Sequence, residues 1–236
     1  MGAIFRREFK AFFTNPIGCV VLAVLYCFSG FYFFAYNMAS GMADLSGGVF
    51  SILFTVTLLA VPFLTMRLFS EDKKQKTDQA LLTAPTGLTG IVLGKFFAAL
   101  LLYVIGISIT LVYAVIIAFK TTPDWMVIFG NYIGLLLVGG LIITIGLFIS
   151  TLTESQIIAA LGTLAVSLLL MSVDILASLF SSITWISNVV EFLSISVRYA
   201  NFTTGLIQYD DFIFFLTLQA LFIFLAVRVL DSKRWN

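Results

Sequence analysis

The side chains of this chain that could do chemistry are concentrated in one polar stretch, between Arg67 and Pro85. Glu71 and Asp72 stand side by side there, directly after Ser70 and before several lysines. Serine is a favourable N-cap residue, and acidic residues in a first turn match the positive end of the helix dipole. The pattern therefore predicts a short helix that begins at Ser70 and ends at Pro85; a solvated, irregular loop is the alternative.

Catalysis through histidine is excluded, because the chain contains no histidine. The usual Ser-His-Asp and Cys-His catalytic sites and His-ligated zinc or haem sites therefore cannot be built. The two cysteines, Cys19 and Cys27, lie eight residues apart in one apolar run. That separation is about 12 Å along a helix, beyond the reach of a disulfide. Both cysteines are interpreted as small apolar side chains.

One segment, from Gly90 to Lys95, looks like a phosphate-binding loop. Its two glycines are separated by three residues instead of four, and Phe96 follows the lysine. A phosphate loop has Ser or Thr after the lysine, and this segment also opens an apolar run. We therefore expect no nucleotide site, no metal site and no cofactor in this chain.

The apolar runs contain uncharged polar side chains but almost no ionisable ones. Lys95 and Asp174 stand near the ends of their runs, and Lys95 is expected to extend its ammonium group to the membrane surface. A transporter driven by protons or ions would be expected to carry charges within the membrane. The driving force for any transport is therefore expected to come from another chain.

A polar face on the first apolar run is the best candidate for a path-lining surface. Tyr26, Ser29, Tyr32 and Tyr36 fall within about a third of a helix circumference. Gln219 stands alone in the last apolar run. These side chains could line a translocation path; alternatively, they form the hydrogen bonds between helices that are common in membrane bundles.

The elements that must position these residues are membrane-spanning helices. Of the 236 residues, 61% are hydrophobic and 11% are charged, whereas a soluble domain has about 25% charged residues. Six apolar segments reach the length of about 20 residues that a helix needs to cross a bilayer. They lie at 17–37, 49–66, 93–119, 126–150, 157–174 and 212–230. The sequence predicts an all-α membrane protein that forms a single domain over residues 1–236.

The distribution of basic residues predicts the orientation. With the N-terminus inside, eleven lysines and arginines face the cytoplasm, and only Lys120 and Arg198 lie outside. Cytoplasmic loops carry such an excess of basic residues. We expect a multi-pass protein of the bacterial cell (inner) membrane with both termini in the cytoplasm. The net charge of +1 gives no indication of nucleic acid binding.

Two further segments are expected to lie at the membrane surfaces. Residues 1–16 place phenylalanines on one face of a helix and Arg6, Arg7 and Lys10 on the other, which predicts an interfacial amphipathic helix; a simple basic anchor is the alternative. Residues 175–211 are apolar apart from Glu191, Arg198 and scattered polar residues. They predict short external helices at the outer leaflet.

The stretch from 67 to 97, which includes the expected cytoplasmic coupling loop 67–92, resembles the cytoplasmic signature of ABC transporter permeases of the type-two superfamily, most of all the gliding-motility (GldF) branch and its NosY relatives. The residues that carry the resemblance are Arg67, Phe69, Glu71, Asp72, Lys73, Thr77, Leu81, Leu82, Thr83 and Pro85, with Gly94, Lys95 and Phe96 after them. Arg7-Glu8-Phe9-Lys10 and Asn15-Pro16 match as well, as do several residues near the C-terminus.

The resemblance implies a dimer of permeases, identical or related, with two cytoplasmic ABC ATPase subunits that bind ATP and Mg. It implies that Glu71, Asp72 and Thr77 belong to a helix coupled to the ATPase, with Arg6, Arg7 and Lys10 on its neighbour. It also implies export and, in some relatives, an extracytoplasmic companion protein. The chain departs from the pattern at Lys76, where glycine is usual, and at Gln79, where glutamate is usual.

The expected function is therefore a permease subunit that is not itself an enzyme and spans the lipid bilayer. Two alternatives stay open. The first is a membrane scaffold or sensor that binds an ATPase without moving a substrate. The second is a membrane enzyme acting on lipid, for which the chain offers few acid–base groups.

Overall fold

The computed structural model describes residues 1–42, 44–76, 87–179, 194–205 and 208–235. Thr77, Gln79 and Pro85 lie outside this part of the chain, as do residues 180–193 and 206–207 of the predicted external segment. Every regular element in the described residues is helical, which confirms the predicted all-α class. Six helices are long and apolar enough to cross a membrane.

The spans follow the predicted segments closely, with extensions of a few residues at most ends. They comprise α2 (Pro16–Tyr32) with η1 (Phe33–Ala39), η2 (Ser46–Phe50) with α3 (Ser51–Thr65), α6 (Leu88–Ile107) with α7 (Ile109–Ala118), α8 (Trp125–Leu152), α9 (Gln156–Leu179) and α12 (Tyr209–Trp235). This is the architecture of a multi-pass membrane protein. The segments η1 and η2 are π-helical.

Three shorter helices lie beside the spans. The first, α1 (Gly2–Thr14), precedes the first span, and Pro16 at the start of α2 separates the two. The second, α4 (Ser70–Lys74), follows α3 after a short turn. The third, α11 (Ile195–Thr203), precedes α12. They lie within the segments in which the sequence predicts short helices, but α4 ends at Lys74 instead of continuing to Pro85 as predicted.

Helix α8 is the most buried span and packs against α3, α6, α9, α11 and α12. Small residues let its neighbours approach. A Cβ atom on Gly139 would lie 2.2 Å from the ring of Tyr103, and one on Gly146 would lie 2.1 Å from Thr65. Close approach at small residues is how membrane helices associate, because lipid supplies no hydrophobic drive between them.

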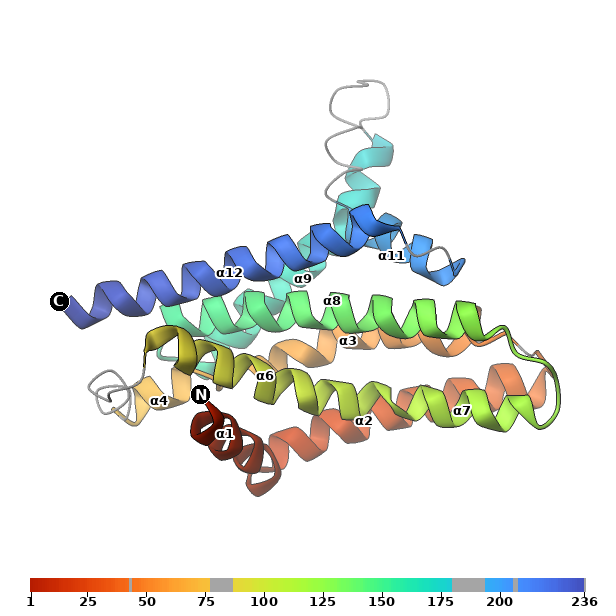
Figure 1. The fold of residues 1–236 in the computed structure, drawn as a ribbon, viewed down its shortest axis with the longest axis horizontal. Helices are drawn as coiled ribbons and strands as arrows, with labels where there is room; N and C mark the ends of the chain where they lie inside the picture. Colours follow the sequence, from red (N-terminus) through yellow and green to blue (C-terminus); the bar gives the residue numbers. More distant parts are fainter. Residues whose placement is uncertain (43, 77–86, 180–193, 206–207, 236) are drawn as a thin grey trace.

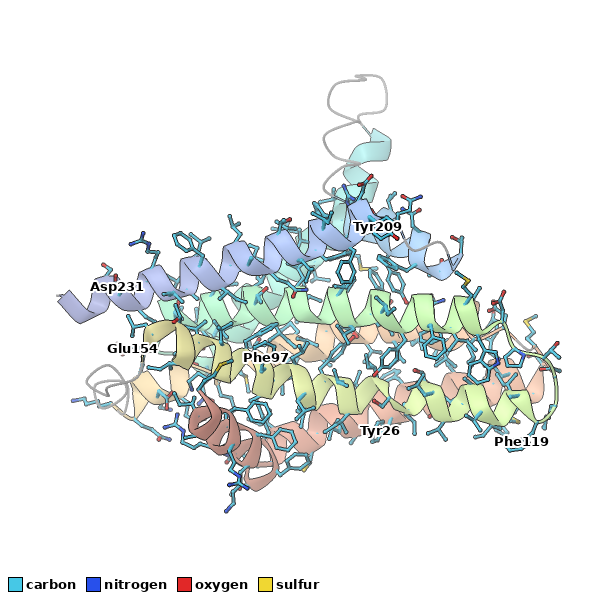
Figure 2. The ribbon with its side chains drawn as sticks, in the orientation of Figure 1. Tyr26, Phe97, Phe119, Glu154, Tyr209 and Asp231 are labelled. Carbon is cyan, nitrogen blue, oxygen red and sulfur yellow. The ribbon has the colours of Figure 1, made fainter. Side chains whose placement is uncertain are left out.

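The two ends of the bundle differ in what they carry. In Figure 1, the start of α1, helix α4 and the end of α12 gather at one end, and the turns that follow η1 and α7 lie at the other. Helix α1 is seen nearly end-on, while the spans run across the view. Glu154 and Asp231 are near the end with α1, and Phe119 is at the opposite end (Figure 2). We call the end with α1 and α4 the terminal end.

Candidate functional site

Lys95 is the centre of a charged cluster at the terminal end of the bundle. It lies in the second turn of α6, and its side chain is 1% exposed. Its Nζ donates to Asp72 Oδ2 at 2.7 Å, to Glu8 Oε1 at 3.0 Å and to the backbone oxygen of Leu68. The three donors of the ammonium group are thereby used.

The ammonium group of Lys95 does not end on an exposed surface. Helices α1 and α4 fold over it and bring carboxylates to it. A buried ammonium group is costly unless it is paired and hydrogen-bonded, and these two carboxylates meet that requirement. The ring of Phe69, 5.0 Å from Nζ, covers another side of the group.

Glu8 joins α1 to this cluster, and the sequence reasoning did not single it out. It shares the face of α1 that carries Phe5, Phe9 and Phe12, since these residues are spaced three or four apart. An acid on an otherwise apolar face is the signal that could have identified it. Phe12 and Glu8 turn inward, while the basic residues of α1 stay exposed.

Arg7 adds a partly exposed cation beside the two carboxylates. Its Nη2 lies 2.5 Å from Glu8 Oε1 and 3.8 Å from Asp72 Oδ2. Partial burial disfavours its charged form, but the hydrogen bond and charge of Glu8 and the charge of Asp72 outweigh this, so the pKa of Arg7 is raised. Two acids from two helices are thus balanced by Lys95 and Arg7.

A second ion pair joins the end of α3 to α4. Arg67 donates through Nε and Nη2 to Glu71 Oε2, at 2.7 and 2.5 Å. With the amide of Asn15 turned so that its oxygen faces the guanidinium, Arg67 Nη2 also donates to it at 2.6 Å. Asn15 connects α1 to α2, so this pair also fixes the junction of those two helices.

The start of α4 is capped by a residue of another helix. Ser150 Oγ, from α8, accepts the backbone N–H groups of Phe69 at 2.9 Å and Ser70 at 3.0 Å. The predicted cap, Ser70, is instead the first residue of α4, and its hydroxyl donates back to the oxygen of Met66. No local sequence pattern identifies Ser150 as the cap, because the contact depends on a fold that brings together residues about eighty apart.

The other end of α4 is tied to α8 as well. Lys73 donates to the backbone oxygen of Thr151, in the last turn of α8. A cation at a helix C-terminus is stabilised by the helix dipole. Beyond α4, Lys76 adopts a φ of +56°, at the position where the resembled permeases usually have glycine.

The predicted coupling residues therefore divide into two groups. Asp72 and Glu71 face inward to Lys95 and Arg67, and Arg7 leans toward Glu8. By contrast, Arg6 and Lys10 are exposed. Thr77 lies outside the described residues.

The predicted path-lining residues are not gathered at one site. Tyr26 donates to the oxygen of Ile105 at 3.1 Å, and Ser29 lies 3.4 Å from the hydroxyl of Tyr113. Gln219, on α12, donates to the oxygen of Leu137 at 3.0 Å. These are hydrogen bonds between helices, the alternative that the sequence left open.

The other two predicted path-lining residues, Tyr32 and Tyr36, make contacts through their rings. Tyr32 is half-buried, and its ring meets Phe31 edge to face. Tyr36 packs its ring against Gly48, where a Cβ would lie 3.1 Å from it. Neither approaches Gln219 through a contact in the described part of the chain.

A separate buried ion pair, away from the charged cluster, lies near the start of α12. Arg198 Nη1, on α11, is 2.6 Å from Asp211 Oδ1, and Asn201 donates to the other carboxylate oxygen at 2.8 Å. The guanidinium also lies 4.0 Å from the ring of Phe214. The pair attaches α11 to α12.

The charged cluster at the terminal end of the bundle joins helices to one another. Its six charged groups pair within the protein: Lys95, Arg7 and Arg67 with Glu8, Asp72 and Glu71. The recess beside Glu8, Arg67 and Glu71 has about 30 Å³, room for water only. Among the described residues, no three His, Cys, Asp or Glu side chains are grouped to hold a metal. Comparison of the sequence with protein-family models and with curated proteins finds no match.

Proposed function

We propose that this chain is the membrane-spanning permease subunit of an ATP-driven ABC exporter. Two permease copies, identical or related, form the translocation path, and separate cytoplasmic ATPase subunits hydrolyse ATP. The six apolar spans support the membrane part of this proposal. The resemblance of residues 67–97 to type-two permeases supports the rest.

One observation carries the coupling part of the proposal. Lys95 binds carboxylates from α1 and α4 at once, so both helices are fixed to the terminal end of span α6. Ser150 and Lys73 fix α4 to α8 in addition. A displacement of α4 would therefore be transmitted directly to α6 and α8. An external ATPase needs such a rigid contact to change the arrangement of the spans.

Because Glu71 and Asp72 pair inside the protein, other residues are needed to test contact with an ATPase. Removing Glu71 or Asp72 breaks contacts inside the protein, so a loss of function there would not distinguish a partner contact from misfolding. Lys74 is exposed on α4, and Lys120 is exposed at the opposite end of the bundle. They provide a matched pair of surface charges.

The experiment is co-expression with an ABC ATPase from the same genome, followed by purification and measurement of ATP hydrolysis in nanodiscs. We expect the two proteins to co-purify. Lys74→Glu should weaken co-purification and hydrolysis, and Lys120→Glu should leave both unchanged. If no ATPase associates with the wild-type chain, the permease proposal fails. If both variants behave like wild type, the assignment of α4 as the contact fails.

A further inference from the structure

Helix α1 has a basic stripe that the charged cluster does not use. Arg6, Lys10 and Phe13 follow one another at spacings of four and three residues, so they share one side of the helix. All three are exposed, and Phe13 is 47% exposed. Within the described part of the chain, no acidic side chain pairs with Arg6 or Lys10. The acid of this helix, Glu8, is held on the opposite side by Lys95.

The opposite face of α1 is packed on the spans. Ile4 lies against Gly94 of α6, where a Cβ atom would be 3.2 Å away, and Phe12 covers Gly18 of α2. Figure 1 shows α1 lying across the end of the bundle, at a steep angle to the spans. Nitrogen-tipped side chains project from α1 away from the bundle (Figure 2).

Helix α1 lies at the end of two helices long and apolar enough to cross a membrane, where a bilayer surface would meet them. Helix α1 packs on the first turns of α6, a membrane span, and leads directly into α2, another span. Exposed apolar surface continues from Phe13 to Val20 on α2, which is 56% exposed. A helix with a basic stripe and an aromatic residue at this depth suits the boundary between lipid headgroups and acyl chains.

We propose that Arg6 and Lys10 bind the phosphate groups of anionic phospholipids, with Phe13 inserted among the acyl chains beneath them. Lipid is favoured over an acidic protein because the stripe ends in exposed apolar side chains that continue onto a membrane span. This proposal depends on the placement of α1 and not on the transport function. It assigns Arg6 and Lys10 to the membrane instead of the ATPase.

The test is thermal unfolding of the purified chain in neutral detergent with increasing dioctanoyl phosphatidylglycerol. Dioctanoyl phosphatidylcholine and inorganic phosphate serve as separate additives. Each basic side chain near an anionic surface contributes about a fivefold gain in affinity. The Arg6→Gln, Lys10→Gln double variant should therefore need about thirty-fold more phosphatidylglycerol for the same rise in Tm.

A matched variant controls for overall charge. Lys74→Gln with Lys76→Gln removes two exposed charges from the same end of the bundle, and it should respond to phosphatidylglycerol like wild type. All three proteins should unfold at the same temperature without lipid, because the substituted side chains make no internal ion pair. The wild-type response should weaken in high salt.

Three outcomes would overturn the proposal. The first is an equal Tm response to phosphatidylcholine or to inorganic phosphate. The second is an unchanged phosphatidylglycerol response in the Arg6 and Lys10 variant. The third is an equal loss in the Lys74 and Lys76 control, which would show a general charge effect. None of these outcomes bears on whether an ATPase binds.

Discussion

Replacing Lys95 by methionine should destabilise the protein more than any other single change in the terminal cluster. The substitution keeps an unbranched side chain, one atom shorter, and removes its charge. It leaves the carboxylates of Glu8 and Asp72, which are 13% and 15% exposed, facing each other without the ammonium group. Removing one partner of a buried ion pair costs about 3–5 kcal/mol, because the remaining charge stays buried.

The other members of the cluster should rank below Lys95 in an order set by their contacts. Asp72→Asn and Glu8→Gln each leave Lys95 with one carboxylate, so each should cost about 1.5–3 kcal/mol, the value of a charged hydrogen bond. Arg7→Gln should cost less than about 1 kcal/mol, since that side chain is half exposed and solvent screens its pairs.

The assay is unfolding in mixed micelles of dodecylmaltoside with increasing SDS, followed by circular dichroism. Each variant yields a free energy of unfolding relative to wild type. A triple variant, Glu8→Gln, Asp72→Asn and Lys95→Met, is the decisive comparison. It has no buried charge left unpaired, so it should recover most of the stability that Lys95→Met loses.

Two results would refute this reasoning. The first is a loss of stability in Lys95→Met equal to the loss in Lys74→Met, which changes an exposed lysine on α4. The second is a triple variant less stable than Lys95→Met alone. It would show that the stability lost in Lys95→Met does not come from leaving the two carboxylates unpaired. In either case α1 and α4 would not be joined through Lys95.

Two other changes test α4 itself. Lys76→Gly should raise the free energy of unfolding by about 1 kcal/mol, because the φ of Lys76, +56°, suits glycine. The same change at Lys74, within the helix, should lower the free energy of unfolding by about 1 kcal/mol. The SDS titration must therefore give changes of opposite sign for the two variants. Ser150→Ala should cost about 1–2 kcal/mol, since it removes the acceptor of the Phe69 and Ser70 amides. Amide hydrogen exchange should then accelerate in α4 and not in the middle of α8, and equal exchange in wild type and variant would contradict the capping role.

The spans were predictable because lipid imposes a length and a composition on any helix that crosses it. Predicted span 126–150 became Trp125–Leu152 and span 93–119 became Leu88–Ala118. The close-packing role of Gly139 and Gly146 was predictable for a similar reason, since small residues recur where membrane helices touch.

The charged cluster was only partly predictable. The helix at Ser70 and the basic face of α1 are local patterns; the helix begins where predicted but ends at Lys74 instead of Pro85, and the basic residues of α1 are exposed. The burial of Lys95 depends on which surface α1 and α4 fold against, and no local pattern carries that information. Glu8 was visible in principle as an acid among phenylalanines, but its role required knowing where Lys95 lies. The cap from Ser150 likewise depends on a distant helix.

The unequal burial of the spans has a consequence for how this sequence can change over time. In the apolar window of α8, 78% of residues are buried, against 22% in that of α9. A random substitution in α8 meets a packed neighbour at about three positions in four, whereas in α9 most positions have no such neighbour within the chain. Related chains should therefore diverge fastest in α9, where any apolar residue suffices, and slowest in α8, where each side chain is fitted to several others at once.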